Sequence, residues 1–259
     1  MASKITFMRL RLFNLVMFVL HAVQGAAVLL LTTDFALPVT SSFVQFDTVQ
    51  QRLLPILETH FELPIGPLVA VFFFLSAVAH LVVSLPMAFE WYTRNLSRGI
   101  NFARWIEYSL SSSVMIVVIA MLVGIYDGVL LLMIALLNAC MILFGLMMEL
   151  HNQSTRRTNW TSFWFGSLAG LGPWIAVAIY LAGAGSGTGA GSQVPTFVYW
   201  IFVSIFVFFN LFAINMVLQY KKIGPWRDYL YGERTYIILS LVAKSLLAWQ
   251  VFAGTLRPV

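Results

Sequence analysis

Two ionisable residues stand out because each lies within a long apolar run of the sequence: Lys244 and Glu107. Ionisable groups are costly in the hydrocarbon of a membrane and usually mark a functional site. A buried lysine is hard to keep as an ammonium ion, and its neutral amine forms Schiff bases with aldehydes. A protonated Schiff base needs an anion beside it, and Glu107 is the acid well inside the apolar runs. A purely structural Lys–Glu ion pair is the alternative, since such pairs are often energetically neutral.

The residue types around this pair favour a binding pocket. Ser240 lies one helical turn before Lys244 on the same face, towards Glu107. Four serines follow Glu107: Ser109, Ser111, Ser112 and Ser113. Aromatic residues add bulk: Trp105, Tyr108, Trp164, Trp174, Phe208, Phe209 and Trp249. Apolar walls with a few polar groups suit a long, conjugated aldehyde, although each aromatic residue alone also fits ordinary helix packing.

Two histidines, His21 and His80, fall near the middle of their own apolar runs. They are candidates for groups that hold a proton beside the lysine. They fit equally well as hydrogen-bonded histidines between helices, so the residues alone leave both interpretations open. Asn138 lies near the middle of a further run.

The elements that must position these residues are membrane-spanning helices, each of which needs about 20 mostly apolar residues. Seven runs meet this requirement: 10–32, 67–89, 101–124, 130–149, 163–183, 196–220 and 233–254. The first run follows basic residues, as a signal peptide does, but exceeds the roughly 7–15 apolar residues of a signal sequence, so we expect a retained helix. The expected architecture is an all-α membrane protein, with residues 1–259 forming a single seven-helix domain.

Composition supports this class. Of 259 residues, 60% are hydrophobic and 10% charged, against roughly 25% charged residues in a soluble domain. Mean hydropathy is +0.88. These values argue against a soluble enzyme, a nucleic-acid-binding protein and a disordered chain. The single cysteine, Cys140, excludes a disulfide framework and cysteine-based metal centres, and we expect no metal site.

Basic residues predict the orientation in the membrane. Twelve lie on the side of the N-terminus, whereas Arg52 and Arg257 lie on the other side and Lys244 within a span. Because cytoplasmic loops carry the excess of Lys and Arg, we expect a multi-pass cell-membrane protein with a cytoplasmic N-terminus and an external C-terminus.

Two external connections differ from the rest. The first, 33–66, is long and acidic, and its residues 39–47 partly alternate between apolar and polar. We expect a small β-hairpin that forms a lid there, with an irregular loop as the alternative. The second, 183–191, has glycine at alternate positions and is expected to be flexible.

Longer motifs resemble one family. Arg104-Trp-Ile-Glu107-Tyr-Ser-Leu-Ser-Ser-Ser-Val-Met-Ile and Ser240-Leu-Val-Ala-Lys244-Ser-Leu-Leu-Ala-Trp-Gln look like the heliorhodopsins, a branch of the retinal-binding rhodopsins. Further segments that share the resemblance are Tyr229-Leu-Tyr-Gly-Glu-Arg234, Asp34-Phe-Ala-Leu-Pro38, Asn138-Ala-Cys-Met-Ile-Leu-Phe-Gly145 and Phe163-Trp-Phe-Gly166. The orientation predicted from charge, inverted relative to most rhodopsins, agrees with that family.

The resemblance implies a rhodopsin-like fold and a role for each matching position. Lys244 would carry all-trans-retinal as a protonated Schiff base, with Glu107 as counterion. A polar cluster beside the Schiff base would comprise Ser240, His21, His80 and Ser76. The retinal pocket would be lined by Trp105, Tyr108, Ser112, Asn138, Met141 and Phe209. An ion-paired cluster at the cytoplasmic ends of the helices would join Arg104, Glu149 and Glu233.

The expected function is a light-sensing photoreceptor that is not an enzyme and does not pump ions. Outward proton pumps among rhodopsins carry a second acid about eleven residues after the counterion, where this chain has Val118. From Ser109 to Tyr126 there is no acid at all. A light-gated proton channel or transporter is the second candidate, and a chromophore-free membrane transporter or scaffold the third. The resemblance also implies a homodimer, and a cytoplasmic signalling partner would have to be a separate molecule.

Overall fold

The computed structural model describes residues 6–186 and 194–256. Within these residues, seven helices are long and apolar enough to cross a membrane. They are α1 (Phe7–Leu31), α2 (Ile65–Val82), α4 (Phe102–Leu122), α5 (Gly128–His151), α6 (Thr161–Gly185), α7 (Thr196–Tyr220) and α8 (Tyr229–Val251). The expected all-α fold with seven spans is therefore confirmed.

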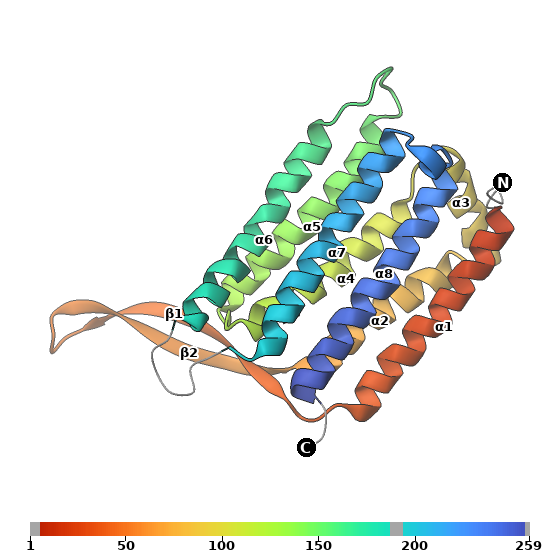
Figure 1. Cartoon of the computed structure of the whole chain (residues 1–259). Helices are drawn as coiled ribbons and strands as arrows, with labels where there is room; N and C mark the ends of the chain where they lie inside the picture. The colour runs from red at the N-terminus through yellow and green to blue at the C-terminus, as the bar shows by residue number, and fades with distance from the viewer. Residues whose placement is uncertain (1–5, 187–193, 257–259) are drawn as a thin grey trace.

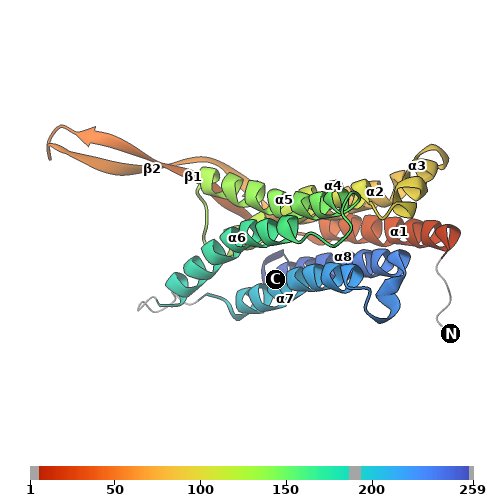
Figure 2. The same cartoon turned by 90° about the horizontal axis from the view of Figure 1, so that it is seen from above.

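The helices form a bundle in which α4 is the most buried (Figures 1 and 2). Helix α4 packs between α2 and α5, α1 packs on α2, and α6 packs on α5. Helices α7 and α8 form a pair that covers the other side of α4, and α8 also contacts α1. Because α4 carries Glu107 and α8 carries Lys244, the packing directs the two residues towards the interior.

The second predicted span, 67–89, is wrong at its end. Helix α2 stops at Val82, and a separate helix, α3 (Pro86–Ser97), begins after a short turn. Proline lacks an amide hydrogen and holds the preceding residue extended, and Leu85 indeed has ψ 144°. The apolar residues that follow Pro86 hid this break from an argument based on hydropathy alone.

Polar caps set several helix ends. The side chains of Thr6, Asn101, Asp127 and Asp228 each accept a hydrogen bond from a backbone amide in the first turn of α1, α4, α5 and α8, respectively. Helix α8 continues beyond Val251 as a short π-helix, η2 (Phe252–Leu256). A 3₁₀ turn, η1 (Gly224–Arg227), joins α7 to α8.

The expected β-hairpin is present between α1 and α2. Strands β1 (Ala36–Asp47) and β2 (Arg52–Pro64) pair antiparallel, with a register shift between Val39 and Thr40. The base is fixed to the bundle because the backbone amide of Thr40 donates to the carbonyl of Tyr126 at 2.8 Å. Beyond this base, the hairpin projects sideways from the bundle (Figure 1). It does not lie across the end of the bundle, as the predicted lid would.

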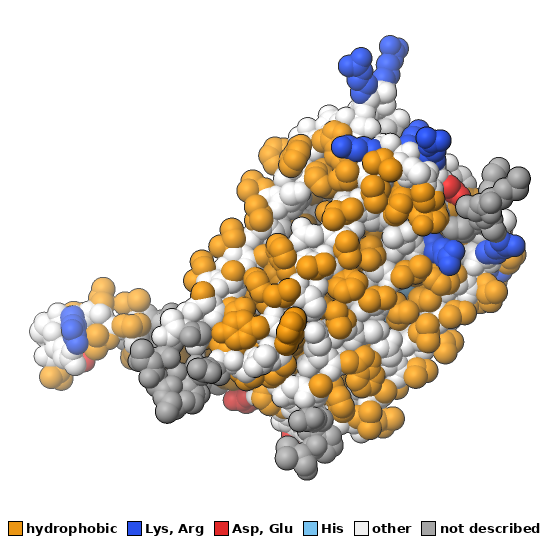
Figure 3. All heavy atoms as spheres, viewed as in Figure 1, with side chains coloured by type: hydrophobic (Ala, Val, Ile, Leu, Met, Phe, Trp, Pro, Cys, Tyr) orange, Lys and Arg blue, Asp and Glu red, His pale blue; other side chains and the backbone are white. Residues whose placement is uncertain are grey.

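The surface matches a lipid environment. Apolar side chains cover the flank of the bundle in Figure 3, and basic side chains gather at the end where α1 begins. We call that end the basic end. Residues 187–191, the larger part of the glycine-rich segment expected to be flexible, lie outside the described residues.

Candidate functional site

The amine of Lys244 and the carboxylate of Glu107 meet inside the bundle. Lys244 Nζ donates to Glu107 Oε1 at 3.2 Å and to Ser240 Oγ at 2.7 Å. Ser240 precedes Lys244 by one turn of α8, so the two side chains share a face. All three residues are buried. The structure therefore brings together the amine, the carboxylate and the hydroxyl of three residues that the sequence analysis placed in one cluster.

A second hydroxyl reaches the same carboxylate from α2. Ser76 Oγ donates to Glu107 Oε1 at 2.6 Å and also lies 3.1 Å from the carbonyl of Phe72. The oxygen that faces the lysine is thus also held by a neighbouring helix, which fixes the carboxylate between α2, α4 and α8.

The two histidines lie side by side next to this pair, with ring centroids 5.3 Å apart. His80 Nδ1 lies 2.7 Å from Asn14 Oδ1, and His21 Nδ1 lies 2.8 Å from the carbonyl of Met17. No hydrogen bond joins either ring to Lys244 or Glu107 among the described residues. The buried Nε2 of His21 has no hydrogen-bond partner among the residues that the structure describes.

Asn14 belongs to this cluster and was not predicted from the sequence. It lies on α1, buried, and its amide also donates to the carbonyl of Leu10 at 2.9 Å. The available signal was its spacing, since Asn14 precedes His21 by seven residues and so shares a helical face with it. Its contact with α2 depended on how the helices pack.

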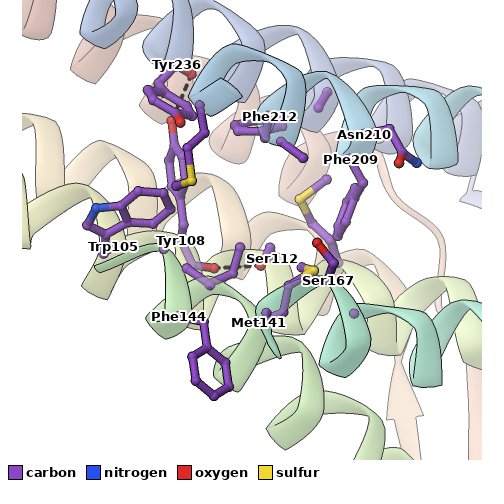
Figure 4. Close-up of a pocket in the computed structure, with 18 of the residues that line it drawn as sticks. Trp105, Tyr108, Ser112, Met141, Phe144, Ser167, Phe209, Asn210, Phe212 and Tyr236 are labelled. Atoms are coloured by element: carbon purple, nitrogen blue, oxygen red, sulfur yellow. Dashed lines mark hydrogen bonds between the residues drawn. The ribbon is translucent and has the colours of Figure 1, made fainter. Parts of the chain in front are cut away.

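A cavity of about 280 Å³ adjoins Lys244 between α4, α5, α6, α7 and α8, and Figure 4 shows part of its lining. Five of the six predicted pocket residues line it: Trp105, Tyr108, Ser112, Met141 and Phe209. The sixth, Asn138, lies behind the wall and donates to Ser112 Oγ at 2.7 Å and Ser113 Oγ at 3.1 Å. Asn138 therefore holds the cavity-facing hydroxyl of Ser112 and does not itself line the cavity.

The other aromatic residues that the sequence analysis named do not all reach the cavity. Trp174 lines the cavity and packs edge-on against Phe209, with ring centroids 5.3 Å apart. Trp164 and Trp249 are exposed on the outside of the bundle, so they do not contribute to the pocket. Tyr236 and Phe212, which the sequence argument missed, complete the wall. Apolar content alone cannot tell which face of a fully apolar helix turns inward.

Glycines make room for the cavity wall. A Cβ at Gly170 on α6 would lie 2.3 Å from the sulfur of Met141. A Cβ at Gly145 on α5 would lie 2.4 Å from the ring of Trp105. The side chains of Met141 and Trp105 thus pack directly on the backbone of a glycine. A larger residue at either glycine would displace the side chain that packs on it.

The three residues predicted to form an ion-paired cluster do so at the basic end. The Arg104 guanidinium donates to Glu149 Oε1 at 2.5 Å and to Glu233 Oε1. Asn101 adds its backbone amide to Glu149 and its side-chain amide to Glu233, at 2.9 and 2.6 Å. The cluster ties α4, α5 and α8 together, because the three charged residues come from these three helices.

One hydrogen bond connects the cluster to the cavity. Trp105 Nε1 donates to Glu149 Oε2 at 2.7 Å, and the indole ring lines the cavity. The hydroxyl of Tyr229 donates to Glu149 Oε1 at 3.1 Å. Glu149 thus contacts both the cavity wall and the ion-paired cluster.

The comparison with known protein families identifies the family of the chain. The family model for heliorhodopsins matches residues 10–256, which is nearly the whole chain. No match was found among curated proteins. The family implies a retinal chromophore. The cavity suits such a group, because its walls are mostly apolar and the amine of Lys244 borders it. The chain belongs to the heliorhodopsin family.

Proposed function

We propose that this protein senses light through all-trans-retinal bound covalently to Lys244, with Glu107 as the counterion. The observation that supports this most strongly is the position of Lys244, whose amine borders the cavity and lies 3.2 Å from a buried carboxylate. When bound, retinal supplies a conjugated double-bond system that absorbs visible light and isomerises. The protein supplies the attachment, the compensating charge and the shape of the pocket.

The residues near the amine set its charge and orientation. Glu107 stabilises positive charge on Nζ, Ser76 fixes that carboxylate from α2, and Ser240 accepts a hydrogen bond from Nζ. His21 and His80 offer imidazole nitrogens close by, and we propose that this polar cluster holds a proton displaced from Nζ during the photocycle. Asn14 orients His80 through its side-chain oxygen.

The pocket residues act by shape. Trp105, Tyr108, Met141 and Phe209 form apolar walls that exclude water and restrict which bond can rotate. Ser112 places one hydroxyl in the wall, held there by Asn138. The wall continues through Trp105 and Glu149 to the ion-paired cluster of Arg104, Glu149 and Glu233. We propose that strain at Lys244 reaches the basic end by this route and by α8 itself, which carries both Lys244 and Glu233.

The proposed output is a change of conformation without ion pumping. Val118 occupies the position of the second acid in outward proton pumps, and it is fully buried in the apolar core. A proton that leaves Nζ thus meets apolar side chains on this part of α4. A signalling partner at the basic end and a homodimer are part of the proposal.

The orientation proposed from the sequence places the N-terminus in the cytoplasm. The gathering of basic side chains at the end where α1 begins supports it (Figure 3). The external end would then carry the hairpin β1–β2 and the end of α8.

Reconstitution tests the proposed function. Membranes containing the protein should develop a visible absorption band after addition of all-trans-retinal. Lys244→Ala should abolish this band, whereas Lys221→Ala, which removes a lysine outside the cavity, should leave it intact. Borohydride reduction followed by mass spectrometry should add the mass of the chromophore to Lys244. A protein that stays colourless, or a Lys244→Ala variant that still colours, would refute the proposal.

A further inference from the structure

A second cleft, separate from the retinal cavity, lies at the basic end. Its volume is about 390 Å³, and three connections form it: the turn after α3, the loop between α5 and α6, and the segment from the end of α7 to the start of α8. Its lining includes the polar side chains of Asn152, Gln219 and Tyr220. Its lining shares no residue with the cavity beside Lys244.

Five basic side chains line the cleft, and none of its lining residues is acidic: Arg98, Arg156, Arg157, Lys222 and Arg227. In the part of the chain that the structure describes, no ion pair engages any of the five. Of the acids on the adjoining helices, Glu149 pairs with Arg104 and Asp228 caps the first turn of α8. No acidic side chain of the lining compensates the basic charge.

The cleft is organised before any ligand binds. Asn152 Oδ1 accepts hydrogen bonds from the backbone of Asn159 at 2.7 Å and from Thr155 Oγ1 at 3.0 Å. The amide of Asn152 donates to the carbonyl of Asn159 at 3.0 Å. These bonds close the α5–α6 loop on itself and set the rim that carries Arg156 and Arg157. A fixed rim reduces the ordering cost of binding.

The backbone conformation of Lys222 and its place in the cleft lining distinguish it from the neighbouring lysine. Its φ of 53° lies in the left-handed region, which lysine rarely adopts. Lys222 lines the cleft, whereas its neighbour Lys221 does not. Similarly, Arg98 lines the cleft and Arg94, four residues earlier in α3, does not. The basic side chains thus converge on one space and are not merely distributed over the end of the bundle.

We propose that this cleft binds a phosphate-bearing anion of high charge. Several guanidinium groups and an ammonium group around one small polar space match the oxygens of a phosphate ester, which accept charge-assisted hydrogen bonds. The phosphate comes either from a soluble phosphate ester or from the headgroup of an anionic phospholipid. Because Tyr229 lines the cleft and donates to Glu149, the ligand sits one residue from the ion-paired cluster.

Calorimetry with inorganic pyrophosphate tests the site on the full chain in maltoside micelles, which contain no phosphate. Ionic strength is held constant with sodium chloride. Lys222→Gln and Arg98→Gln should each weaken pyrophosphate binding roughly tenfold, the loss of one charge-assisted contact. The matched variants Lys221→Gln and Arg94→Gln remove the same charge from the same end and should bind as the unmodified protein does.

A parallel arm distinguishes the two sources of phosphate. Native mass spectrometry counts phosphatidylglycerol molecules retained by the same four variants. Loss of a retained lipid in Lys222→Gln and Arg98→Gln, but not in their controls, identifies a lipid headgroup, whereas selectivity for pyrophosphate alone identifies a soluble ester. Either selective result supports the site. If cleft variants and controls behave alike in both arms, or neither ligand binds, the proposal is overturned. Both arms use protein without retinal, so their outcome is independent of light sensing.

Discussion

Lys244 Nζ lies 3.2 Å from Glu107 Oε1, although 137 positions separate the two residues in the sequence. Ser240 and Ser76 approach from the two sides of this pair, so the amine and the carboxylate each have a second partner. A buried charge pair with further hydrogen bonds is the arrangement in which removal of one member has the largest effect.

Glu107→Gln should change the spectrum of the retinal-loaded protein. Without the anion, the positive charge of the ground state is less stabilised, so the visible band should shift to longer wavelength. The loss of the anion should also make the Schiff base nitrogen on Lys244 release its proton more readily. The visible band should therefore disappear at a lower pH than in the unmodified protein. Absorption spectra recorded over a pH titration measure both effects. Glu90→Gln, at an exposed position of α3, is the control, and an unchanged spectrum and titration for Glu107→Gln would assign the counterion elsewhere.

Arg104→Gln should destabilise the bundle strongly. The substitution leaves Glu149 and Glu233 buried without their cation, and such a loss costs about 3–5 kcal/mol. Thermal unfolding in detergent, followed by circular dichroism, should show a markedly lower midpoint. Arg94→Gln, at an exposed position, should change the stability by no more than about 0.5 kcal/mol. Equal midpoints for the two variants would contradict a structural role for the cluster.

Gly170→Ala should impair retinal binding. The new methyl group would clash with the sulfur of Met141. Either the side chain of Met141 moves into the cavity, or the backbone of α6 is distorted. The rate and yield of visible-band formation after retinal addition should both decrease. Gly183→Ala on the same helix is the control, because a Cβ there meets nothing within 4 Å. Alanine also favours helix over glycine, so a loss restricted to Gly170→Ala reflects the pocket and not helix propensity.

Illumination should cause no net proton movement. Liposomes containing the retinal-loaded protein should show no light-induced change of pH, since α4 has buried Val118 in place of a second acid. A light-driven proton pump in parallel liposomes provides the positive control. A light-dependent pH change that disappears in Lys244→Ala would instead favour the channel or transporter alternative.

The sequence alone determined the features that depend on composition and local spacing. Seven apolar runs of sufficient length predict seven spans because backbone polar groups in lipid must be paired within each helix. The pairing of Lys244 with Ser240 follows from helical periodicity, and the alternation in residues 39–47 indicated the hairpin. The motifs around Glu107 and Lys244 also identified the family.

Only the tertiary structure decided which faces meet. Asn138 turned out to support Ser112 from behind, Asn14 joined His80 across two helices, and Trp164 and Trp249 faced outward. These helices are apolar on most sides, because one side packs against protein and the other against lipid, so hydropathy carries little information about rotation. The break before Pro86 and the convergence of five basic side chains on one cleft likewise depend on backbone geometry and helix packing, which residue types and spacing do not specify.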